Sequence, residues 1–372
     1  MNNNKEYDLV VYIGRFQPFH IAHQKTIERG FELADNVLVL VGSAYGARSI
    51  DNPFSFDERN MMISSTFYDE YFTSATEHNL EVKPARDFTY DINAWIANTN
   101  KIVNAHVKEN LLDETKIAII GHDKDATSFY LNHFPQWAEI EMPAYPPVGD
   151  TIDATKIRRL MFEKNYHFTK GVLPFPVYAM LFETYDTASG MDESWIDTPQ
   201  AELMFLEWEN DQVQRAKWDG APYPVQFVTA DAVVIQSGHI LLIKRATFPG
   251  YGLWAMPGGF VEFWERCRPA ILRELFEETG IKVPIKVLDR AIDGYEHFDD
   301  PKRSTRGRTY SHTYRITLDP TQKLPKVKGD GKETFEAKWF TLAEFDEMEG
   351  VMFEDHYHII KTMLSQSARS VR

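Results

Sequence analysis

The sequence places a short apolar segment, a turn and the start of a helix within residues 8–23, which read DLVVYIGRFQPFHIAH. Residues 8–13 have the continuous apolar pattern of a buried strand, and residues 21–34 repeat their apolar side chains at helical spacing. A strand followed closely by a helix is typical of a parallel sheet with right-handed crossovers. This stretch therefore predicts an α/β fold for the N-terminal part of the chain.

The same alternation continues along the chain. Residues 36–41 form a second predicted strand that ends at Gly42, and residues 116–120 form another that ends at Gly121. Ligands of parallel sheets sit at the carboxyl ends of the strands. We therefore expect a Rossmann-like domain, with helices on both faces of a parallel sheet and a ligand site at these turns.

Two histidines lie at the predicted start of the first helix. His20 and His23 are three residues apart, so they share one face of the helix. The helix N-terminus adds free N–H groups and a positive dipole end, which suit a phosphate. An isolated histidine more often caps or packs a helix, but the combined strand, turn and helix favour a donor cluster for phosphoryl or nucleotidyl transfer.

The string from Gly14 to His23 resembles the signature of the nucleotidyltransferase superfamily that includes the nicotinamide mononucleotide (NMN) adenylyltransferases. Residues 152–158, IDATKIR, resemble its second signature, although Asp153 and Ala154 stand where small hydroxyl residues are common. The resemblance implies that the NMN phosphate attacks the α-phosphorus of ATP in line, without a covalent intermediate. It implies catalytic roles for Arg15, His20, His23 and Arg158, a weaker one for Lys124, and nucleotide contacts from Gly14, Phe16, Gly121, Asp123 and Thr155.

Three further stretches resemble the archaeal-type branch, in which this domain can be fused to a Nudix domain. Residues 52–59, NPFSFDER, resemble its Asn-Pro-Phe…Glu-Arg segment, and residues 121–125, GHDKD, resemble its nucleotide-binding loop. The segment from Arg86 and Asp87 to Trp95 resembles its nicotinamide-side segment, in which a tryptophan stacks on the pyridine ring. Burial habits alone would make Trp95 a core residue, so its binding role rests on the resemblance.

A second motif fills residues 259–281, GFVEFWERCRPAILRELFEETGI. Glu274, Glu277 and Glu278 lie at positions i, i+3 and i+4 of one predicted helix, so three carboxylates converge on one face. They would repel one another, and hard oxygen donors at this spacing suit Mg²⁺, with Mn²⁺ as an alternative. Pro269 suits the first turn of this helix, whose start we expect to be shifted.

Residues 259–281 satisfy every position of the Nudix box, and this part of the chain is identified as a Nudix domain, an α/β/α sandwich with a mixed sheet. A solvated acidic helix face would not explain the length of the motif. The resemblance implies metal binding by Glu274 and Glu278 with Gly258, catalytic assistance from Glu277, bracing of the carboxylates by Arg273 and support of the loop by Glu265.

Residues 297–309, HFDDPKRSTRGRT, resemble a segment of ADP-ribose-cleaving Nudix proteins. Arg306 and Arg308 could hold the diphosphate or the terminal ribose, although a basic surface loop is an equally good interpretation. The catalytic base is left open among three later acidic residues, Asp330, Glu333 and Glu336.

The chain of 372 residues is long for one core, so two domains are expected. We predict a nucleotidyltransferase domain in residues 1–188, a connecting helix and linker in residues 189–224, and the Nudix domain in residues 225–372. The tryptophans of the connector favour a packed segment over a floppy one. After it, two apolar segments around a Ser-Gly turn at residues 237–238 predict a hairpin.

The formal net charge of −15 disfavours nucleic-acid partners but allows small phosphate-bearing substrates. The single cysteine, Cys267, fits a reducing compartment. The N-terminus has no signal-peptide pattern, and no apolar run approaches the ~20 residues that span a bilayer. We expect a cytoplasmic protein with nucleotide partners and no membrane contact, and a homo-oligomer stays open.

Together the motifs predict a bifunctional enzyme that makes NAD and pyrophosphate from NMN and ATP, and hydrolyses ADP-ribose to AMP and ribose 5-phosphate, with Mg²⁺ at both sites. One alternative changes the substrates, to nicotinate mononucleotide or phosphopantetheine for the transferase and to another nucleoside diphosphate derivative for the hydrolase. Another makes the C-terminal domain an ADP-ribose sensor. The intact carboxylate set disfavours the sensor, and the lack of a helix-turn-helix or basic extension disfavours DNA regulation.

Overall fold

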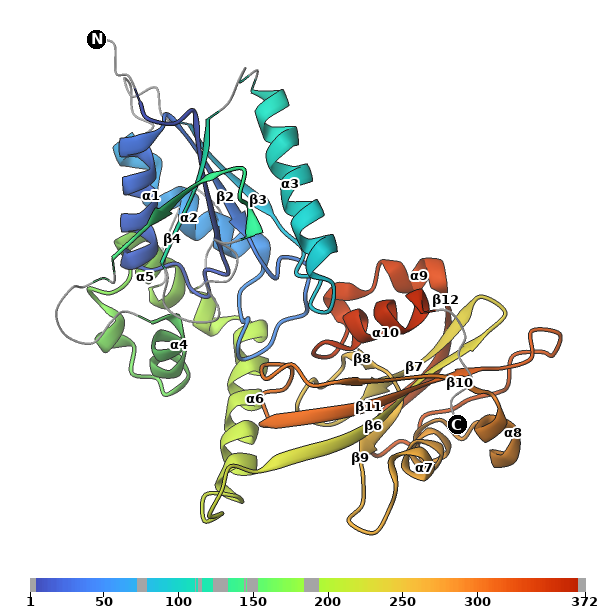
Figure 1. The fold of residues 1–372 in the computed structure, drawn as a ribbon. Coiled ribbons are helices and arrows are strands. Elements are labelled where there is room, and N and C mark those ends of the chain that lie inside the picture. The colour runs from blue at the N-terminus through green and yellow to red at the C-terminus, as the bar shows by residue number, and fades with distance from the viewer. Residues whose placement is uncertain are drawn as a thin grey trace. The chain divides into compact units, whose positions relative to one another are not determined.

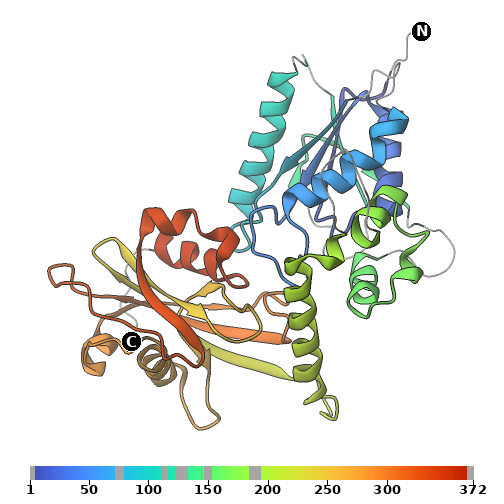
Figure 2. The ribbon, with the colours of Figure 1, turned by 180° about the vertical axis from the view of Figure 1, so that it is seen from behind.

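The computed structural model describes residues 5–71, 79–110, 112, 116–122, 133–143, 145, 153–183 and 194–366. The chain divides into two compact units, Met1–Phe205 and Leu206–Arg372, whose elements are drawn from two sides in Figures 1 and 2. The division falls inside helix α6 (Pro199–Ala216), within the segment predicted to connect the domains. Among the described helices, none is long and apolar enough to cross a membrane.

The first unit is built on a parallel five-stranded sheet. The strand order is β3 (Asn79–Pro84), β2 (Asn36–Val41), β1 (Leu9–Gly14), β4 (Ile117–Gly121) and β5 (Ala138–Glu141). The chain runs outward from β1 to β3 and then returns to β4 on the other side of β1. Ligand sites in such sheets lie at the carboxyl ends of the strands where the order reverses.

Helices cover both faces of this sheet because successive side chains of a strand point to opposite sides. Leu9 and Val11 of β1 share a core cluster with Val103 of α3 (Ile92–Glu109). Val10 faces the other way and packs against Gly30 of α1 (Ile21–Leu33). The predicted parallel sheet with helices on both faces is confirmed. Further α-helices described in this unit are α2 (Phe56–Tyr71), α4 (Ala154–Phe162) and α5 (Phe175–Phe182).

The second unit contains a mixed sheet. Its strands run in the order β10 (Ile292–Phe298), β11 (Arg308–Thr317), β6 (Gln226–Gln236), β7 (His239–Arg245) and β12 (Thr334–Thr341), with β8 (Trp254–Ala255) on β7 and β9 (Gly258–Phe260) on β6. Strands β6 and β11 are parallel, and the other pairs are antiparallel. Helices α7 (Cys267–Thr279) and α8 (Ile285–Arg290) lie on one face, and α9 (Leu342–Asp346) and α10 (His356–Ser365) on the other (Figure 1). The predicted sandwich is confirmed.

Local signals of the sequence are also confirmed in this unit. Strands β6 and β7 form the predicted hairpin, with positive φ angles at Ser237 (49°) and Gly238 (73°) that are typical of a type I′ turn. Helix α7 begins at Cys267, so Pro269 lies in its first turn, and the helix ends at Gly280.

Helix α6 is anchored in the second unit by a buried carboxylate. Glu207 is only 6% exposed, and its carboxylate accepts a hydrogen bond from the Gly250 N–H (3.4 Å). Burial raises the pKa of Glu207 to about 7, and the charge of Glu354 adds to this, while Gly250 and Arg245 oppose it.

We expect Glu207→Gln to stabilise the protein at pH 8 relative to the wild type, and to do so much less at pH 5. Because the folded-state pKa lies above the ordinary value of 4.5, the protonated group contributes stability below that value, which is lost as the pH rises through about 7. The difference is about 3 kcal/mol at most. Thermal unfolding of both proteins at the two pH values checks this. An equal shift of Tm at pH 5 and pH 8 would contradict it.

Candidate active sites

The turns that follow β1, β2 and β3 meet at the carboxyl edge of the parallel sheet. The Gly42 N–H donates to the Gly14 carbonyl (2.9 Å), which joins the first two turns. The carboxylate of Asp87, beyond β3, accepts hydrogen bonds from the Ser43 N–H (2.8 Å) and the Ser43 Oγ (2.6 Å). Three segments that are distant in sequence therefore line one edge of the sheet, where the site was predicted.

Arg59 holds these turns together, a role that sequence reasoning missed. Its guanidinium donates to the carbonyls of Arg15 (2.8 Å), Gly42 (2.7 Å) and Ser43 (3.1 Å), and the side chain is fully buried. Burial lowers its pKa to about 10, which still leaves it charged at neutral pH. The sequence carried a signal, because Arg59 ends the Asn-Pro-Phe…Glu-Arg segment of residues 52–59, but an arginine in the first turns of a helix is more often solvated and it was given no role.

The two histidines lie together at the start of α1. Their rings stack with centroids 3.6 Å apart, and His23 Nδ1 accepts a hydrogen bond from the His20 N–H (3.3 Å). Because Nδ1 accepts, the proton of a neutral His23 ring is on Nε2, which makes Nε2 a donor. His23 therefore has a capping role, and the same contact orients its ring.

Two arginines lie close to this helix start. Arg158 of α4 is buried, and it donates to the Gln17 carbonyl (2.8 Å) and to Asp51 (3.2 Å). Burial lowers the pKa of Arg158, Asp51 opposes this, and the charge of the exposed Arg15 lowers it further. The positive charges of Arg15 and Arg158 thus repel each other, and a phosphate group bound by both would relieve this repulsion.

Other predicted contacts of the first site have more local roles. The Thr155 N–H donates to Asp153, which caps α4 at the position where a small hydroxyl residue was expected (2.8 Å). Gly14 is required by a close approach, since a Cβ there would lie 2.7 Å from the ring of the buried Phe16. Gly121 is the last residue of β4, and Asp123 and Lys124 lie outside the described residues.

The nicotinamide-side segment packs against the protein. Trp95, on α3, is half-buried against the core cluster, with its ring 5.6 Å from that of Phe134. Asp87 is held by Ser43, as described above. These placements match the interpretation of Trp95 as a core residue and leave its stacking role a prediction.

The second site is built on α7. Glu274 and Glu278 are both buried, while the side chain of Glu277 is 58% exposed. The Glu278 carboxylate accepts a hydrogen bond from the Gly258 N–H (2.8 Å). A Cβ at Gly259 would lie 2.6 Å from the Glu274 carboxylate, which would then have to move. Gly258 and Gly259 of β9 and two of the three carboxylates therefore form one compact site, called the carboxylate site below.

Arg273 braces this site, as predicted. Its guanidinium donates to Glu265 (2.9 Å), Glu274 (2.8 Å) and Glu277 (3.1 Å). These contacts raise the pKa of Arg273, and in return Arg273 lowers the pKa of Glu265. One cation therefore orients carboxylates from both ends of the motif.

The residues fit a divalent cation. Burial raises the pKa of Glu274 and holds that of Glu278 well above its usual range, and the charge of Glu274 raises the latter further. Two buried carboxylates that repel each other would gain from a shared cation, and their oxygen donors suit Mg²⁺ or Mn²⁺.

The three later acidic residues, Asp330, Glu333 and Glu336, have different surroundings in the structure. The charge of Glu333 contributes to the raised pKa values of both Glu274 and Glu278. Asp330 instead accepts the backbone N–H groups of its own turn, including that of Thr334 (2.9 Å). Glu336 is exposed on β12. Of these three, Glu333 is the one whose charge is among the causes of the raised pKa values of Glu274 and Glu278.

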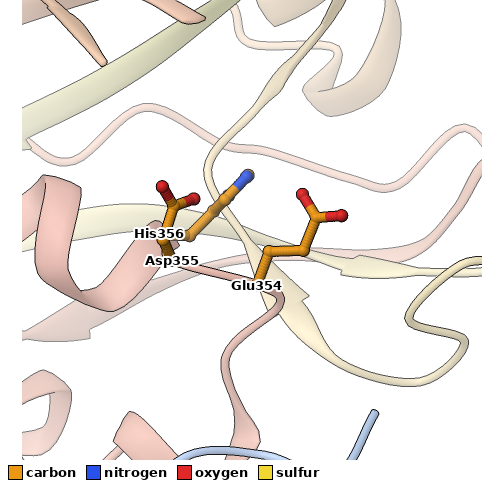
Figure 3. Close-up of side chains that lie close together, drawn as sticks. All are labelled: Glu354, Asp355 and His356. Atoms are coloured by element: carbon orange, nitrogen blue, oxygen red, sulfur yellow. The ribbon is translucent and has the colours of Figure 1, made fainter. Parts of the chain in front are cut away.

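Residues 297–309, called the arginine-rich segment here, are anchored by a second cluster of side chains, Glu354, Asp355 and His356 (Figure 3). The buried Arg303 forms two hydrogen bonds with Asp355, both 3.0 Å, and Arg306 lies 3.8 Å from Glu354. Burial, with the charge of Arg303, holds the pKa of His356 well below its usual range. Since arginines already compensate these carboxylates, the cluster positions the segment and does not favour a cation.

The two predicted arginines of this segment differ in their surroundings. The guanidinium of Arg306 lies 5.1 Å from the ring centroid of Phe260, the residue that follows Gly258 and Gly259 in β9. Arg308 lies over Tyr310 at 5.0 Å and contacts Asp299 (3.4 Å). Arg306 is therefore the one that the structure places next to the carboxylate site.

Comparisons with known proteins agree with the fold of both units. A family model described as cytidylyltransferase-like matches residues 11–160, and a NUDIX domain model matches residues 225–363. The fold and the sites therefore define a nucleotidyltransferase domain joined to a Nudix domain.

Individual relatives cover each half and the whole chain. A nicotinamide/nicotinic acid mononucleotide adenylyltransferase of Acinetobacter baylyi is 33% identical over 46% of this chain and 85% of its own. An ADP-ribose pyrophosphatase of Methanocaldococcus jannaschii is 34% identical over 36% of this chain and 70% of its own. The crystal structure of a bifunctional NMN adenylyltransferase/ADP-ribose pyrophosphatase of Francisella tularensis, with AMP and a manganese ion, is 32% identical and covers 96% of this chain and 98% of its own, with a TM-score of 0.82. The chain belongs to the family of bifunctional NMN adenylyltransferase/ADP-ribose pyrophosphatases.

Proposed function

We propose that the two reactions of the family take place at the two sites described above, NAD synthesis from NMN and ATP in the first unit and ADP-ribose hydrolysis in the second. The observation that carries this proposal is the separation of the sites. Each lies within its own compact unit. Incubation with ATP plus NMN, or with ADP-ribose, in the presence of Mg²⁺ and chromatography of the products test it. Absence of NAD in the first reaction, or of AMP and ribose 5-phosphate in the second, would contradict it.

In the first unit, an oxygen of the NMN phosphate forms a bond to the α-phosphorus of ATP as the bond to pyrophosphate breaks. The N-terminus of α1, His23 Nε2 and the guanidinium groups of Arg15 and Arg158 stabilise the charge that develops on the phosphate oxygens. This role needs hydrogen-bond donors that are already positioned before the substrate binds. The hydrogen bond between His20 and His23 and that between Arg158 and Gln17 hold the two donor side chains in position. A divalent cation would supply additional charge neutralisation on the departing pyrophosphate.

In the second unit, a water oxygen bonds to a phosphorus of the diphosphate while one bridging P–O bond breaks, which yields AMP and ribose 5-phosphate. We assign Glu333 as the group that accepts the proton of this water, since of the three later acidic residues it is the one whose charge raises the pKa of Glu274 and Glu278. Arg306 would hold the diphosphate. Glu274 and Glu278 would bind Mg²⁺ or Mn²⁺, which supplies Lewis-acid polarisation of the phosphate.

The single cysteine and the nucleotide substrates support a cytoplasmic location for both reactions.

We expect kcat/KM of the transferase to be roughly tenfold to a hundredfold higher for NMN than for nicotinate mononucleotide, which corresponds to about 1–3 kcal/mol. The reason is Asp87, whose carboxylate at the sheet edge would accept from a carboxamide and repel a carboxylate. The Acinetobacter relative is named for both the nicotinamide and the nicotinic acid mononucleotide, so its name does not indicate which of the two this chain prefers. Steady-state kinetics with each substrate checks it. Asp87→Asn should narrow the ratio, and equal efficiency of the wild type for both substrates would refute the expectation.

A further inference from the structure

The loop between β2 and α2, residues 42–55, is tied to Arg158 of the first site. The buried Gln17 side chain exchanges two hydrogen bonds with the backbone of Phe54, in which Nε2 donates to the Phe54 carbonyl (2.9 Å) and Oε1 accepts from the Phe54 N–H (3.0 Å). Arg158 donates to the Gln17 carbonyl (2.8 Å) and to the carboxylate of Asp51 (3.2 Å). Two acceptors of Arg158 are therefore part of this loop or bonded to it.

The end of the loop is fixed to α2 by the carboxylate of Glu58. The guanidinium of Arg48 donates to both Glu58 oxygens, at 2.6 and 2.9 Å, and also to the Pro53 carbonyl (2.5 Å). The same carboxylate accepts the Ser55 N–H (2.7 Å). Since a bidentate arginine–carboxylate pair has a defined geometry, the path of the loop depends on how Glu58 is oriented.

Trp195 contacts both of these anchors from a distant part of the sequence. It begins the 3₁₀ turn η3 (Trp195–Asp197), in the first half of the segment predicted to connect the domains, and it belongs to the first unit. Its indole N–H donates to Glu58 (3.1 Å), a residue 137 positions earlier in the chain. Its ring, only 4% exposed, lies with its centroid 4.6 Å from that of Phe54. The connector is therefore packed against the loop.

The indole N–H completes the hydrogen bonding of Glu58. A carboxylate has about four lone-pair sites, two on each oxygen. Glu58 Oε2 accepts from Arg48 and from the Ser55 N–H, while Oε1 accepts from Arg48 and from Trp195. A tryptophan that only filled the core would need no charged acceptor. The placement of its N–H instead indicates that Trp195 helps to fix the orientation of Glu58.

We propose that Trp195 is a positioning residue of the transferase. It holds residues 42–55 in the conformation in which Asp51 and Gln17 orient Arg158 for the phosphate. The proposal rests on the transferase function proposed above, in which Arg158 stabilises the developing charge. It gives the first half of the connector a role in NAD synthesis, although its sequence predicts only a packed linker.

Trp195→Phe tests the proposal, because it keeps a ring against Phe54 and removes the N–H that Glu58 accepts. We expect kcat for NAD synthesis to fall roughly tenfold and KM for ATP to change less than about twofold, since the orientation of a transition-state donor is lost. The rate is expressed per ATP-binding site, measured by equilibrium titration, so that unfolded protein does not count. Tyr68→Phe is the matched control. It also removes one donor from an aromatic residue, and Tyr68 is 67% exposed on α2, so kcat should equal that of the wild type.

A second background separates positioning from a purely structural role. When Arg158 is replaced by alanine, the added Trp195→Phe substitution should lower the single-turnover rate by less than about twofold, because the group through which Trp195 acts is absent. A tenfold fall in both backgrounds would show that Trp195 acts independently of Arg158, and the proposal would be wrong. If Arg158→Ala does not fold, Asp51→Ala is the alternative background, since the Asp51 side chain is 53% exposed. The same reduced effect is expected there.

Two further outcomes would overturn the proposal. One is an unchanged kcat per ATP-binding site in Trp195→Phe. The other is a parallel loss of ADP-ribose hydrolysis, since the variant would then act on the protein as a whole. If the wild type itself makes no NAD from NMN, ATP and Mg²⁺, the proposed transferase function fails. That result differs from an active wild type whose rate Trp195→Phe does not change.

Discussion

Glu278→Gln should lower the rate of ADP-ribose hydrolysis roughly a hundredfold to a thousandfold and leave NAD synthesis close to that of the wild type. The substitution keeps the size of the side chain and removes one negative charge. In the structure Glu278 is buried against the Gly258 N–H, where a carboxylate is costly unless a cation compensates it. If Glu278 binds the catalytic cation, loss of its charge removes several kcal/mol of transition-state stabilisation.

The two activities of this variant would be measured on the same preparation, by chromatography of the products. Glu347→Gln is the matched control, since Glu347 is an exposed glutamate of the same unit outside α7. Distant, independent sites behave additively, so NAD synthesis should not respond to either substitution. Loss of both activities in a protein that keeps its circular dichroism would require a shared or obligatorily coupled site. If neither activity changed, the carboxylate helix would not be catalytic and an ADP-ribose sensor would become the better interpretation.

His23→Ala should lower the rate of adenylyl transfer roughly a hundredfold or more, the scale for one preorganised donor at a developing charge. ATP binding should weaken much less, because the proposed contact strengthens in the transition state. ADP-ribose hydrolysis should be unaffected. The variant also loses the hydrogen bond between the His20 N–H and His23 Nδ1. We therefore expect its free energy of unfolding to fall by about 1 kcal/mol, which would appear as a small decrease in Tm.

Single-turnover rates and ATP affinity separate these effects, and His167→Ala is the control. His167 is an exposed histidine of the same unit, on the 3₁₀ turn Tyr166–Thr169, and its removal should change neither quantity. If His23→Ala keeps near wild-type turnover and only lowers Tm, His20 and His23 are capping residues alone.

Much of the fold follows from local patterns. The strand, turn and helix of residues 8–34 and the spacing of Glu274, Glu277 and Glu278 are properties of neighbouring residues, because strand and helix periodicity decide which side chains share a face. The same holds for the hairpin at Ser237 and for the end of α7 at Gly280, where the backbone conformation depends on a few residues. These features could be predicted without knowledge of any distant contact.

Roles that depend on partners far along the chain could not be predicted in this way. By local pattern Arg59 is a solvated helix residue, and only the folded structure shows that it donates to the carbonyls of Arg15 and Gly42. In the same way, only the folded structure shows that Asp330 caps its own turn while Glu336 is exposed on β12.

The sequence by itself determined the two domain types, the helix that carries the carboxylates and the histidine pair at the first helix start, since each depends on spacing within one segment. Only the tertiary structure decided which arginine lies beside the carboxylate site, which glutamates of α7 are buried, and that Trp195 of the connector contacts Phe54 and Glu58. The physical reason is that burial, charge and hydrogen bonding at these positions come from residues that chain folding brings together, and their identity is not encoded in local periodicity.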